Sequence, residues 1–335
     1  MTRARTRLSL AGLATALAAT ALVAVPSAEA RQRASAPPAD NGARVVAQTQ
    51  VDARTIDLTI QSPSLGAQGK VRLLTPAGWQ QGDGRAYSTL WLLHGCCEEE
   101  DYKSWTEFTD VEQFTADKPV LVVMPTAGKI GMYSDWWNYG LSNKPNWRAF
   151  HMEEVMQIVQ RGFGASQGKH SVAGLSMGAY GALEYATRYP TRFGAVAAYS
   201  GAPDVLAPGL PEVTQLNMIA QGFLIWGVLW GDPWWQRQRW IDHNPAYKLD
   251  KLRGAKIYLS AGNGDLGPLD PEGKGIVPGL LESQSLGNSR DFATKAKRAG
   301  VDITTDFYAP GTHSWPYWER QLHKSWPLLA SGMGL

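Results

Sequence analysis

The chain has 335 residues, with 32 Lys and Arg against 30 Asp and Glu, and a formal net charge of +2. No basic patch stands out, which argues against a nucleic-acid partner. The two cysteines are the neighbours Cys96 and Cys97, so a conventional disulfide framework is excluded. Neighbouring Cα atoms lie about 3.8 Å apart, below the usual disulfide span, so a vicinal bridge needs a distorted turn and stays an open alternative.

Residues 1–30 are predicted to be a signal peptide. Three arginines precede the apolar stretch 8–25, and Ser-Ala-Glu-Ala at 27–30 offers an A-x-A cleavage site. The alternative, an uncleaved membrane anchor, fits less well because the Ala- and Thr-rich stretch is weakly apolar. Cleavage leaves 305 residues and, because it removes three arginines and Glu29, a formal charge of zero. We expect a secreted or cell-envelope protein without a stable membrane span.

The mature chain is predicted to be one α/β domain, residues 45–335, behind a disordered Ala- and Pro-rich leader at 31–44. Polar and apolar residues alternate at 55–60 and 70–74, which predicts an antiparallel pair at the sheet edge. Buried parallel strands are expected at 88–93, 120–124, 171–173, 195–199 and 257–260. Helices are expected at 148–160, 179–189, 291–299 and 316–329. This alternation indicates a doubly wound, mostly parallel sheet with helices on both faces.

Ligands of such sheets bind beyond the carboxyl ends of the strands. One of these ends carries Gly174-Leu-Ser176-Met-Gly178, a G-x-S-x-G pattern between a strand-like and a helix-like segment. This is the sequence of a nucleophile elbow, in which small flanking residues leave room for a sharp turn. A glycine-rich helix entry with a capping serine is the plain structural alternative, because so short a motif also arises by chance.

A nucleophilic Ser176 requires a histidine to take its proton and a carboxylate to orient that histidine. His313 fits best, because it follows the strand-like segment 303–308, whereas His323 falls inside a helix. The acid remains open at this point among Asp265, Asp270 and Glu282.

The remaining requirement is a pair of backbone N–H groups for the developing oxyanion. Met177, directly after the serine, is expected to supply one of them. Cys96, in the loop after the strand at 88–93, is expected to supply the other. A cysteine nucleophile is the alternative for this loop, but no motif supports it.

The segment Gly311-Thr-His-Ser-Trp-Pro-Tyr-Trp318 resembles the histidine loop of the antigen 85-type mycolyltransferases, relatives of esterase D among the α/β-hydrolases. Similar correspondences run from about residue 55 to 330. They are Leu92-Leu93-x-Gly95, Asp101-Tyr102, Trp105, Tyr133-Ser134-Asp135-Trp136, the elbow, Ser200-Gly201, Gly262-Asn263-Gly264, Leu281-Glu282 and Gln321-Leu322.

This resemblance implies an α/β-hydrolase fold with a Ser, Glu and His triad. Its glutamate follows a leucine about thirty residues before the histidine, which selects Glu282 over the two aspartates. The mycolyltransferases carry an aspartate and an arginine where this chain has His94 and Cys97, and the aspartate helps hold trehalose. The change argues against trehalose and favours hydrolysis. It also makes His94 a candidate pocket residue.

Five tryptophans gather in an insertion at about 205–250, namely Trp226, Trp230, Trp234, Trp235 and Trp240. Packing beneath a long loop is the plain interpretation. The alternative is an apolar lid or acyl-binding wall, with Trp226 and Trp230 as pocket candidates and Trp315 bordering the same pocket.

The sequence therefore predicts a secreted serine carboxylic ester hydrolase with Ser176, Glu282 and His313 as its triad. One alternative is an acyltransferase that moves an acyl chain to a sugar or glycerol hydroxyl. Another is a non-catalytic secreted binding protein. No cofactor or metal is expected, because no H-E-x-x-H motif or metal-ligand cluster appears. The expected partner is an acyl-ester or lipid substrate.

Overall fold

The computed structural model describes residues 36–270 and 276–335, so the predicted signal peptide lies outside the described residues. The expected disordered leader differs from the structure over 36–43. There Ala36, Ala39 and Ala43 are buried in the main core, and Arg161 donates a hydrogen bond to the Pro38 carbonyl. The alanines that make this segment look featureless in the sequence are small enough to pack against a helix. The domain begins ahead of residue 45.

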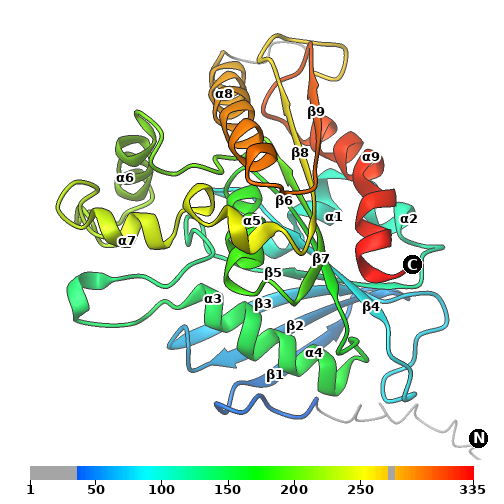
Figure 1. Ribbon diagram of the computed structural model, residues 1–335. Coiled ribbons are helices and arrows are strands. Elements are labelled where there is room, and N and C mark those ends of the chain that lie inside the picture. The colour runs from blue at the N-terminus through cyan, green and yellow to red at the C-terminus, as the bar shows by residue number, and fades with distance from the viewer. Residues whose placement is uncertain (1–35, 271–275) are drawn as a thin grey trace, which may run out of the picture. The chain divides into compact units, whose positions relative to one another are not determined.

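Nine strands of the described residues form one sheet in the order β1-β2-β3-β5-β4-β6-β7-β8-β9 (Figure 1). They are β1 (Arg44–Gln50), β2 (Thr55–Ser62), β3 (Ala67–Leu74), β4 (Ser88–Leu93), β5 (Val120–Pro125), β6 (His170–Leu175), β7 (Phe193–Tyr199), β8 (Lys256–Gly262) and β9 (Ile303–Tyr308). The pairs β1/β2, β2/β3 and β3/β5 are antiparallel, and the rest are parallel. The predicted mostly parallel sheet and its antiparallel N-terminal edge are confirmed.

Helices cover both faces of this sheet and enclose two apolar cores (Figure 1). Leu183 and Phe292 belong to the core on one face, and Trp105 and Leu322 to the core on the other. The longer helices are α4 (Met156–Gly162), α5 (Met177–Arg188), α6 (Leu210–Ala220), α7 (Arg237–Asp242), α8 (Val277–Arg298) and α9 (Trp315–Met333). The shorter ones are η1 (Asp101–Lys103), α1 (Ser104–Phe108), α2 (Val111–Phe114), η2 (Asn138–Gly140), α3 (Trp147–Ala149), η3 (Phe150–Val155), η4 (Pro245–Tyr247) and η5 (Leu249–Leu252).

Helix α8 is the main departure from the expected helices. The predicted helix 291–299 is its carboxyl-terminal part, while the helix itself begins at Val277 and includes Glu282. Its first half interrupts good helix formers such as Leu281 with Gly279, Gly287 and two serines, which obscure the helix in the sequence. Pro278 sits in the first turn, where its missing N–H costs nothing.

Membrane-spanning helices are absent from the described residues: over 36–270 and 276–335 no helix combines the length and apolarity needed to cross a bilayer.

Candidate active site

Ser176 lies at the sharp junction between β6 and α5. Its φ is 52° and its ψ is −117°, a backbone conformation that non-glycine residues rarely adopt. Its N–H donates to the Tyr199 carbonyl at 2.9 Å, which ties the turn to the neighbouring strand β7. The side chain borders a cavity of about 670 Å³. Both features fit the predicted elbow.

The two glycines of the pentapeptide are required by close backbone approach. A Cβ on Gly178 would lie 2.3 Å from the Leu93 carbonyl oxygen and 2.5 Å from that of His94. A Cβ on Gly174 would lie 2.2 Å from the Gly178 carbonyl oxygen. Any larger residue would therefore push α5 away from the end of β4.

His313 and Glu282 form a pair beside this cavity. His313 Nδ1 lies 2.9 Å from Glu282 Oε2, and His313 borders the cavity while Glu282 is completely buried. Glu282 Oε1 accepts hydrogen bonds from Ser200 Oγ at 2.8 Å and from the Gly262 N–H at 2.6 Å. Ser200 Oγ in turn accepts from Trp318 Nε1 at 2.9 Å. The carboxylate is therefore fixed from β7, β8 and α9 at once.

The two aspartates that rivalled Glu282 lie elsewhere. Asp265 is exposed, and its carboxylate accepts a hydrogen bond from Asn263. Asp270 accepts hydrogen bonds from Tyr317 at 2.9 Å and from Thr312, the residue before His313. Asp270 therefore braces the histidine loop, while Glu282 is the carboxylate that the structure brings to His313.

The cavity is mostly apolar, as expected for a site that takes acyl groups. Its wall draws on the loops after β4, β5 and β7, on the elbow, on α6 and α8, and on the histidine loop with the start of α9. Its lining residues include Gly95, Cys96, Glu98, Ile130, Met132, Leu175, Ser176, Met177, Tyr180, Val205, Leu210, Val213, Asn217, Val277, Leu281, His313, Trp315 and Trp318. Of the four predicted pocket residues, Trp315 borders the cavity. His94, Trp226 and Trp230 are not among its lining residues.

The predicted oxyanion donors, Met177 and Cys96, both border the cavity. The Cys97 N–H donates to the Lys129 carbonyl at 2.7 Å. In the part of the chain that the structure describes, no backbone carbonyl accepts from the Met177 or Cys96 N–H, which leaves both amides available for a ligand. Cys96 and Cys97 are joined as a vicinal disulfide, and Cys97 has a positive φ of 82°.

His94 is buried at the start of the loop after β4, where hydrogen bonds hold its side chain. Its Nε2 lies 3.1 Å from Asp101 Oδ2, and its Nδ1 lies 2.6 Å from the Gly95 carbonyl. Tyr133 donates to the His94 carbonyl at 2.9 Å. Burial alone would lower the pKa of His94, but the charge and hydrogen bond of Asp101 raise it overall. The side chain points into this network because Asp101 attracts it, so His94 shapes the loop instead of lining the cavity.

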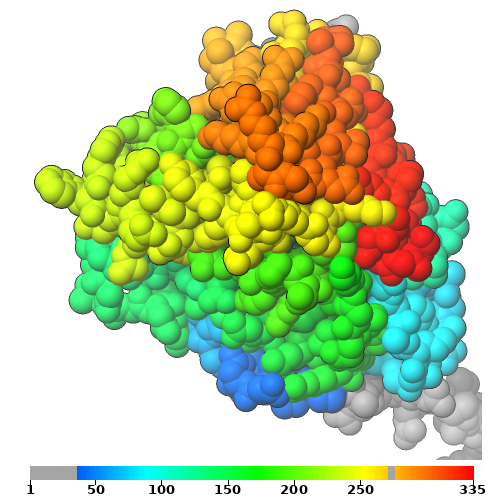
Figure 2. Space-filling model, viewed as in Figure 1, coloured from blue at the N-terminus to red at the C-terminus, as the bar shows by residue number. Residues whose placement is uncertain are grey.

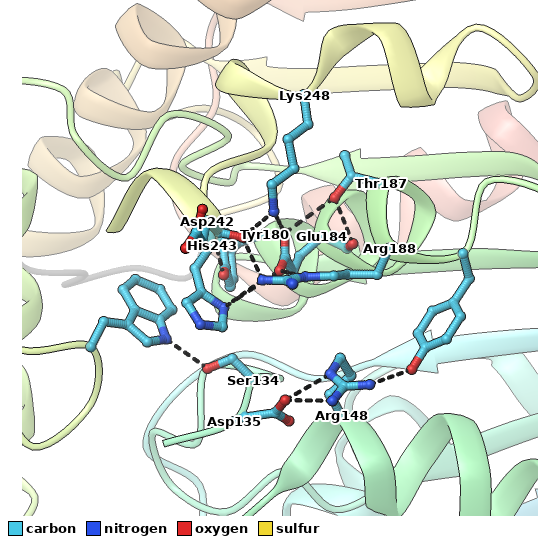
Figure 3. A network of polar contacts seen from close by, with 12 residues as sticks. Ser134, Asp135, Arg148, Tyr180, Glu184, Thr187, Arg188, Asp242, His243 and Lys248 are labelled. Atoms are coloured by element: carbon cyan, nitrogen blue, oxygen red, sulfur yellow. Dashed lines mark hydrogen bonds and ion pairs between the residues drawn. The ribbon is translucent and has the colours of Figure 1, made fainter. Parts of the chain in front are cut away.

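Trp230 is buried in the insertion for a similar reason. Its Nε1 donates to Ser134 Oγ at 3.0 Å, and its ring stacks on His243 with centroids 5.0 Å apart. Figure 3 shows that His243 continues into a polar network around Glu184 of α5, where Glu184 Oε1 lies 2.7 Å from Arg188 Nε and 3.5 Å from His243 Nδ1. The packing interpretation therefore holds for Trp230, which fastens the insertion to the helix that follows Ser176.

Trp226 is half-buried, and its Nε1 donates to Asp232 Oδ2 at 3.1 Å within the insertion itself. It belongs to the local fold of that segment and not to the cavity wall.

Glu98 and Ser200 are site residues to which the sequence patterns assign no role. Glu98 borders the cavity and accepts a hydrogen bond from Ser104. Burial raises its pKa, nearby acids add to the rise, and His94 and Trp315 partly offset it. The run of three glutamates at 98–100 reads as a solvated face, so nothing in the sequence singles out its first member. Ser200 falls only within the Ser200-Gly201 correspondence, which assigns no role to it.

A mostly parallel sheet covered by helices, with a strained serine between strand and helix and a histidine lining the same cavity, is the architecture of the α/β-hydrolase fold. A family model described as "Putative esterase" matches residues 62–329, and the chain belongs to this family.

The relatives agree with that assignment. Esterase Rv1288 of Mycobacterium tuberculosis is 29% identical over 276 residues, covering 81% of this chain but only 58% of the relative. Diacylglycerol acyltransferase/mycolyltransferase Ag85C of Mycobacterium avium is 30% identical over 275 residues, covering 79% of this chain and 74% of the relative. The crystal structure of M. tuberculosis MPT51 (FbpC1) superposes with a TM-score of 0.70 at 24% identity, covering 84% of this chain and all of that one, and it shows the shared fold.

The described residues hold no group of three or more His, Cys, Asp or Glu placed to bind a metal ion. The expectation that the chemistry needs no cofactor stays a prediction.

Proposed function

We propose that this protein is a serine carboxylic ester hydrolase that works through an acyl-enzyme on Ser176. The observation that carries the proposal is the Ser176 junction, where a strained serine shares one cavity with His313, itself paired with the buried Glu282. Membership of the esterase family supports the same reaction class.

In this mechanism Ser176 Oγ attacks the ester carbonyl while His313 Nε2 takes the hydroxyl proton. Glu282 accepts the hydrogen bond of His313 Nδ1–H and stabilises the imidazolium that forms. The Met177 and Cys96 amides donate to the oxyanion of the tetrahedral intermediate. His313 returns the proton to the leaving alcohol. In the second half of the reaction water attacks the acyl carbon while His313 takes its proton, and His313 then gives that proton to Ser176 Oγ as the acid leaves.

The test is turnover of p-nitrophenyl butyrate by the wild type and by Ser176→Ala. We expect the variant to lose at least about 10⁴-fold in kcat/KM, because the nucleophile is gone while the fold is kept. A fluorophosphonate probe should label the wild type at Ser176, as mapped by mass spectrometry. Labelling at another residue, or full activity in the variant, would overturn the assignment and leave the binding-protein alternative.

Acyl transfer is the second candidate, because one relative is named as an acyltransferase and shares 30% identity. The two reactions share every step up to the acyl-enzyme and differ only in whether water or an alcohol attacks it. The departure at His94 and Cys97 favours water. Product analysis with added glycerol or trehalose separates the two, since acylated glycerol or sugar in place of free acid would establish transfer.

We further propose that the protein is exported by residues 1–30 and acts outside the cell as a single catalytic domain. The basis is the charged, apolar and A-x-A order of that segment. Amino-terminal sequencing of the protein from culture medium tests this, with cleavage after Ala30 as the expected result. Retention of the full-length chain in the membrane fraction would contradict it.

A further inference from the structure

Two segments far apart in the sequence form one lobe at the edge of the molecule. We call residues 137–146 and 221–240 the apolar lobe. The Trp137 N–H donates to the Leu229 carbonyl at 2.7 Å, and the Asn138 N–H donates to the Val228 carbonyl at 2.9 Å. Tyr139 donates to the Trp226 carbonyl as well. In Figures 1 and 2 the part of the lobe around α7 projects beside α6, away from the sheet.

The apolar lobe exposes an unusual amount of hydrophobic side chain. Its exposed members are Tyr139 at 46%, Leu141 at 90%, Phe223 at 38%, Leu224 at 78%, Ile225 at 64%, Trp234 at 61% and Trp235 at 87%. Single exposed apolar residues are normal, but seven of them within one lobe, two of them neighbouring tryptophans, point to an interaction surface. Tryptophan in particular favours the boundary between lipid and water, where its ring is buried and its N–H stays wet.

The charges of the lobe favour an anionic partner. Its cations are Lys144, Arg237 and Arg239, all exposed, and its only carboxylate is Asp232. That carboxylate accepts the N–H groups of Trp234 and Trp235 at 2.9 Å each and so shapes the turn that presents the two rings. Exposed apolar rings on a segment with three cations and one carboxylate are the composition of a surface that binds anionic lipid.

The apolar lobe also continues directly from the cavity wall. Leu210, Val213 and Asn217 of α6 border the cavity, and α6 ends at Ala220, just before the exposed Phe223. We propose that the apolar lobe docks the protein on an anionic lipid surface, which places the cavity beside acyl chains held in that surface. This goes beyond ester hydrolysis and does not depend on it.

Flotation with vesicles tests the proposal. The probe is a set of phosphatidylglycerol and phosphatidylcholine vesicles, with pure phosphatidylcholine vesicles beside them. The variant is Trp234→Ser with Trp235→Ser. The control is Val46→Ser with Val51→Ser, two exposed apolar residues on β1 and just after it. Ser176→Ala is floated too, and each protein's turnover of dissolved p-nitrophenyl butyrate is measured.

We expect the wild type, the control and Ser176→Ala to float with the anionic vesicles, and the double tryptophan variant to bind at least about tenfold more weakly. Binding should weaken as salt rises and on pure phosphatidylcholine. Turnover of the dissolved ester should be unchanged in the tryptophan variant, which separates this proposal from the one on Ser176. Absence of vesicle binding, or equal binding by the tryptophan variant, overturns it. So does a wild-type dimer in solution that the tryptophan change dissociates without any vesicle binding.

Discussion

Two carboxylate and histidine pairs flank Ser176, and they differ in what surrounds them. Glu282 and His313 meet at 2.9 Å, and the histidine borders the cavity. Asp101 and His94 meet at 3.1 Å, with both side chains buried away from it. The first pair has an open nitrogen to offer a substrate. The second pair is fully hydrogen-bonded within the fold: His94 Nδ1 bonds to the Gly95 carbonyl, and Asp101 Oδ2 accepts from Thr126 Oγ1 and the Ala127 N–H.

The comparison shows that residue type does not decide whether such a pair performs chemistry. A histidine with one nitrogen facing a cavity can exchange a proton with a bound molecule, whereas a histidine enclosed on both nitrogens can only position its neighbours. His94 holds the loop that carries the Cys96 amide, so the closed pair supports the reaction by setting geometry. Four substitutions, in order of expected effect, test the open pair, the elbow beside it, the closed pair and the cavity wall.

Glu282→Gln should have the largest effect. Glutamine keeps the shape of the side chain but removes the charge that stabilises a protonated His313, so we expect kcat to fall by about 10²- to 10⁴-fold on p-nitrophenyl butyrate. Asp265→Asn is the control, because that exposed rival carboxylate should be dispensable. Loss of activity in Asp265→Asn with activity kept in Glu282→Gln would reverse the assignment of the acid.

Gly178→Ala should be next, through stability. The added Cβ meets the carbonyl oxygens of Leu93 and His94 within 2.5 Å, and backbone atoms cannot yield as a flexible side chain would. We expect the free energy of unfolding to drop by about 2–4 kcal/mol in urea denaturation. Gly287→Ala on α8 is the matched control, because its Cβ has open space, and it should stabilise the helix by up to about 1 kcal/mol. Equal stabilities would mean that the elbow tolerates a wider separation from β4.

The sequence predicted the architecture and the positions of Ser176 and His313 just after strands, because both depend on local patterns. Apolar runs mark buried strands, and strand ends mark the loops where Ser176 and His313 lie. The acid could not be chosen in this way, because Glu282 reaches His313 only through the placement of α8, whose first half is interrupted by Gly279 and Gly287. Family resemblance supplied that choice.

The direction of individual side chains was beyond the sequence. His94 follows a strand just as a pocket residue would, and only the position of Asp101 turns it away from the cavity. The tryptophans of the insertion divide in the same way: Trp230 is buried against Tyr180 of α5, while Trp235, five residues later, is exposed. Burial of a large ring depends on contacts that are distant in the chain.

Asp101→Asn should destabilise the fold by about 1–3 kcal/mol and do so in a pH-dependent way. Burial would raise the pKa of Asp101, but His94 and the hydrogen bonds from Thr126 and the Ala127 N–H together outweigh burial and hold it below 3.8. The contribution of Asp101 therefore fades as the pH falls through that lowered pKa. The pKa of His94 is raised above 6.5, so its contribution is complete below 6.5 and fades as the pH rises through the raised value.

The stability difference between wild type and Asp101→Asn should therefore be largest between about pH 4 and 6.5, as measured by urea denaturation across the pH range. A difference that stays constant with pH would show that the pair is not charged in the folded protein. Because the pair is closed, kcat should fall far less than in Glu282→Gln.

Glu98→Gln should have the smallest effect and should bear on substrate choice. Glu98 lies between the two pairs: its charge acts on His94, and the Trp315 side chain, two residues after His313, hydrogen-bonds to it. A carboxylate in the cavity wall should repel esters that carry a negative charge. We expect Glu98→Gln to raise kcat/KM for a hemisuccinate ester by about two- to tenfold over a neutral ester of the same length. Glu99→Gln is the control, because Glu99 is exposed and pairs with Lys129 at 2.5 Å.

In the wild type the preference for neutral over negatively charged esters should weaken as the pH falls. Burial raises the pKa of Glu98, and protonation of this carboxylate removes the repelling charge. A preference that follows Glu99, or that ignores pH, would place the selecting charge elsewhere in the cavity.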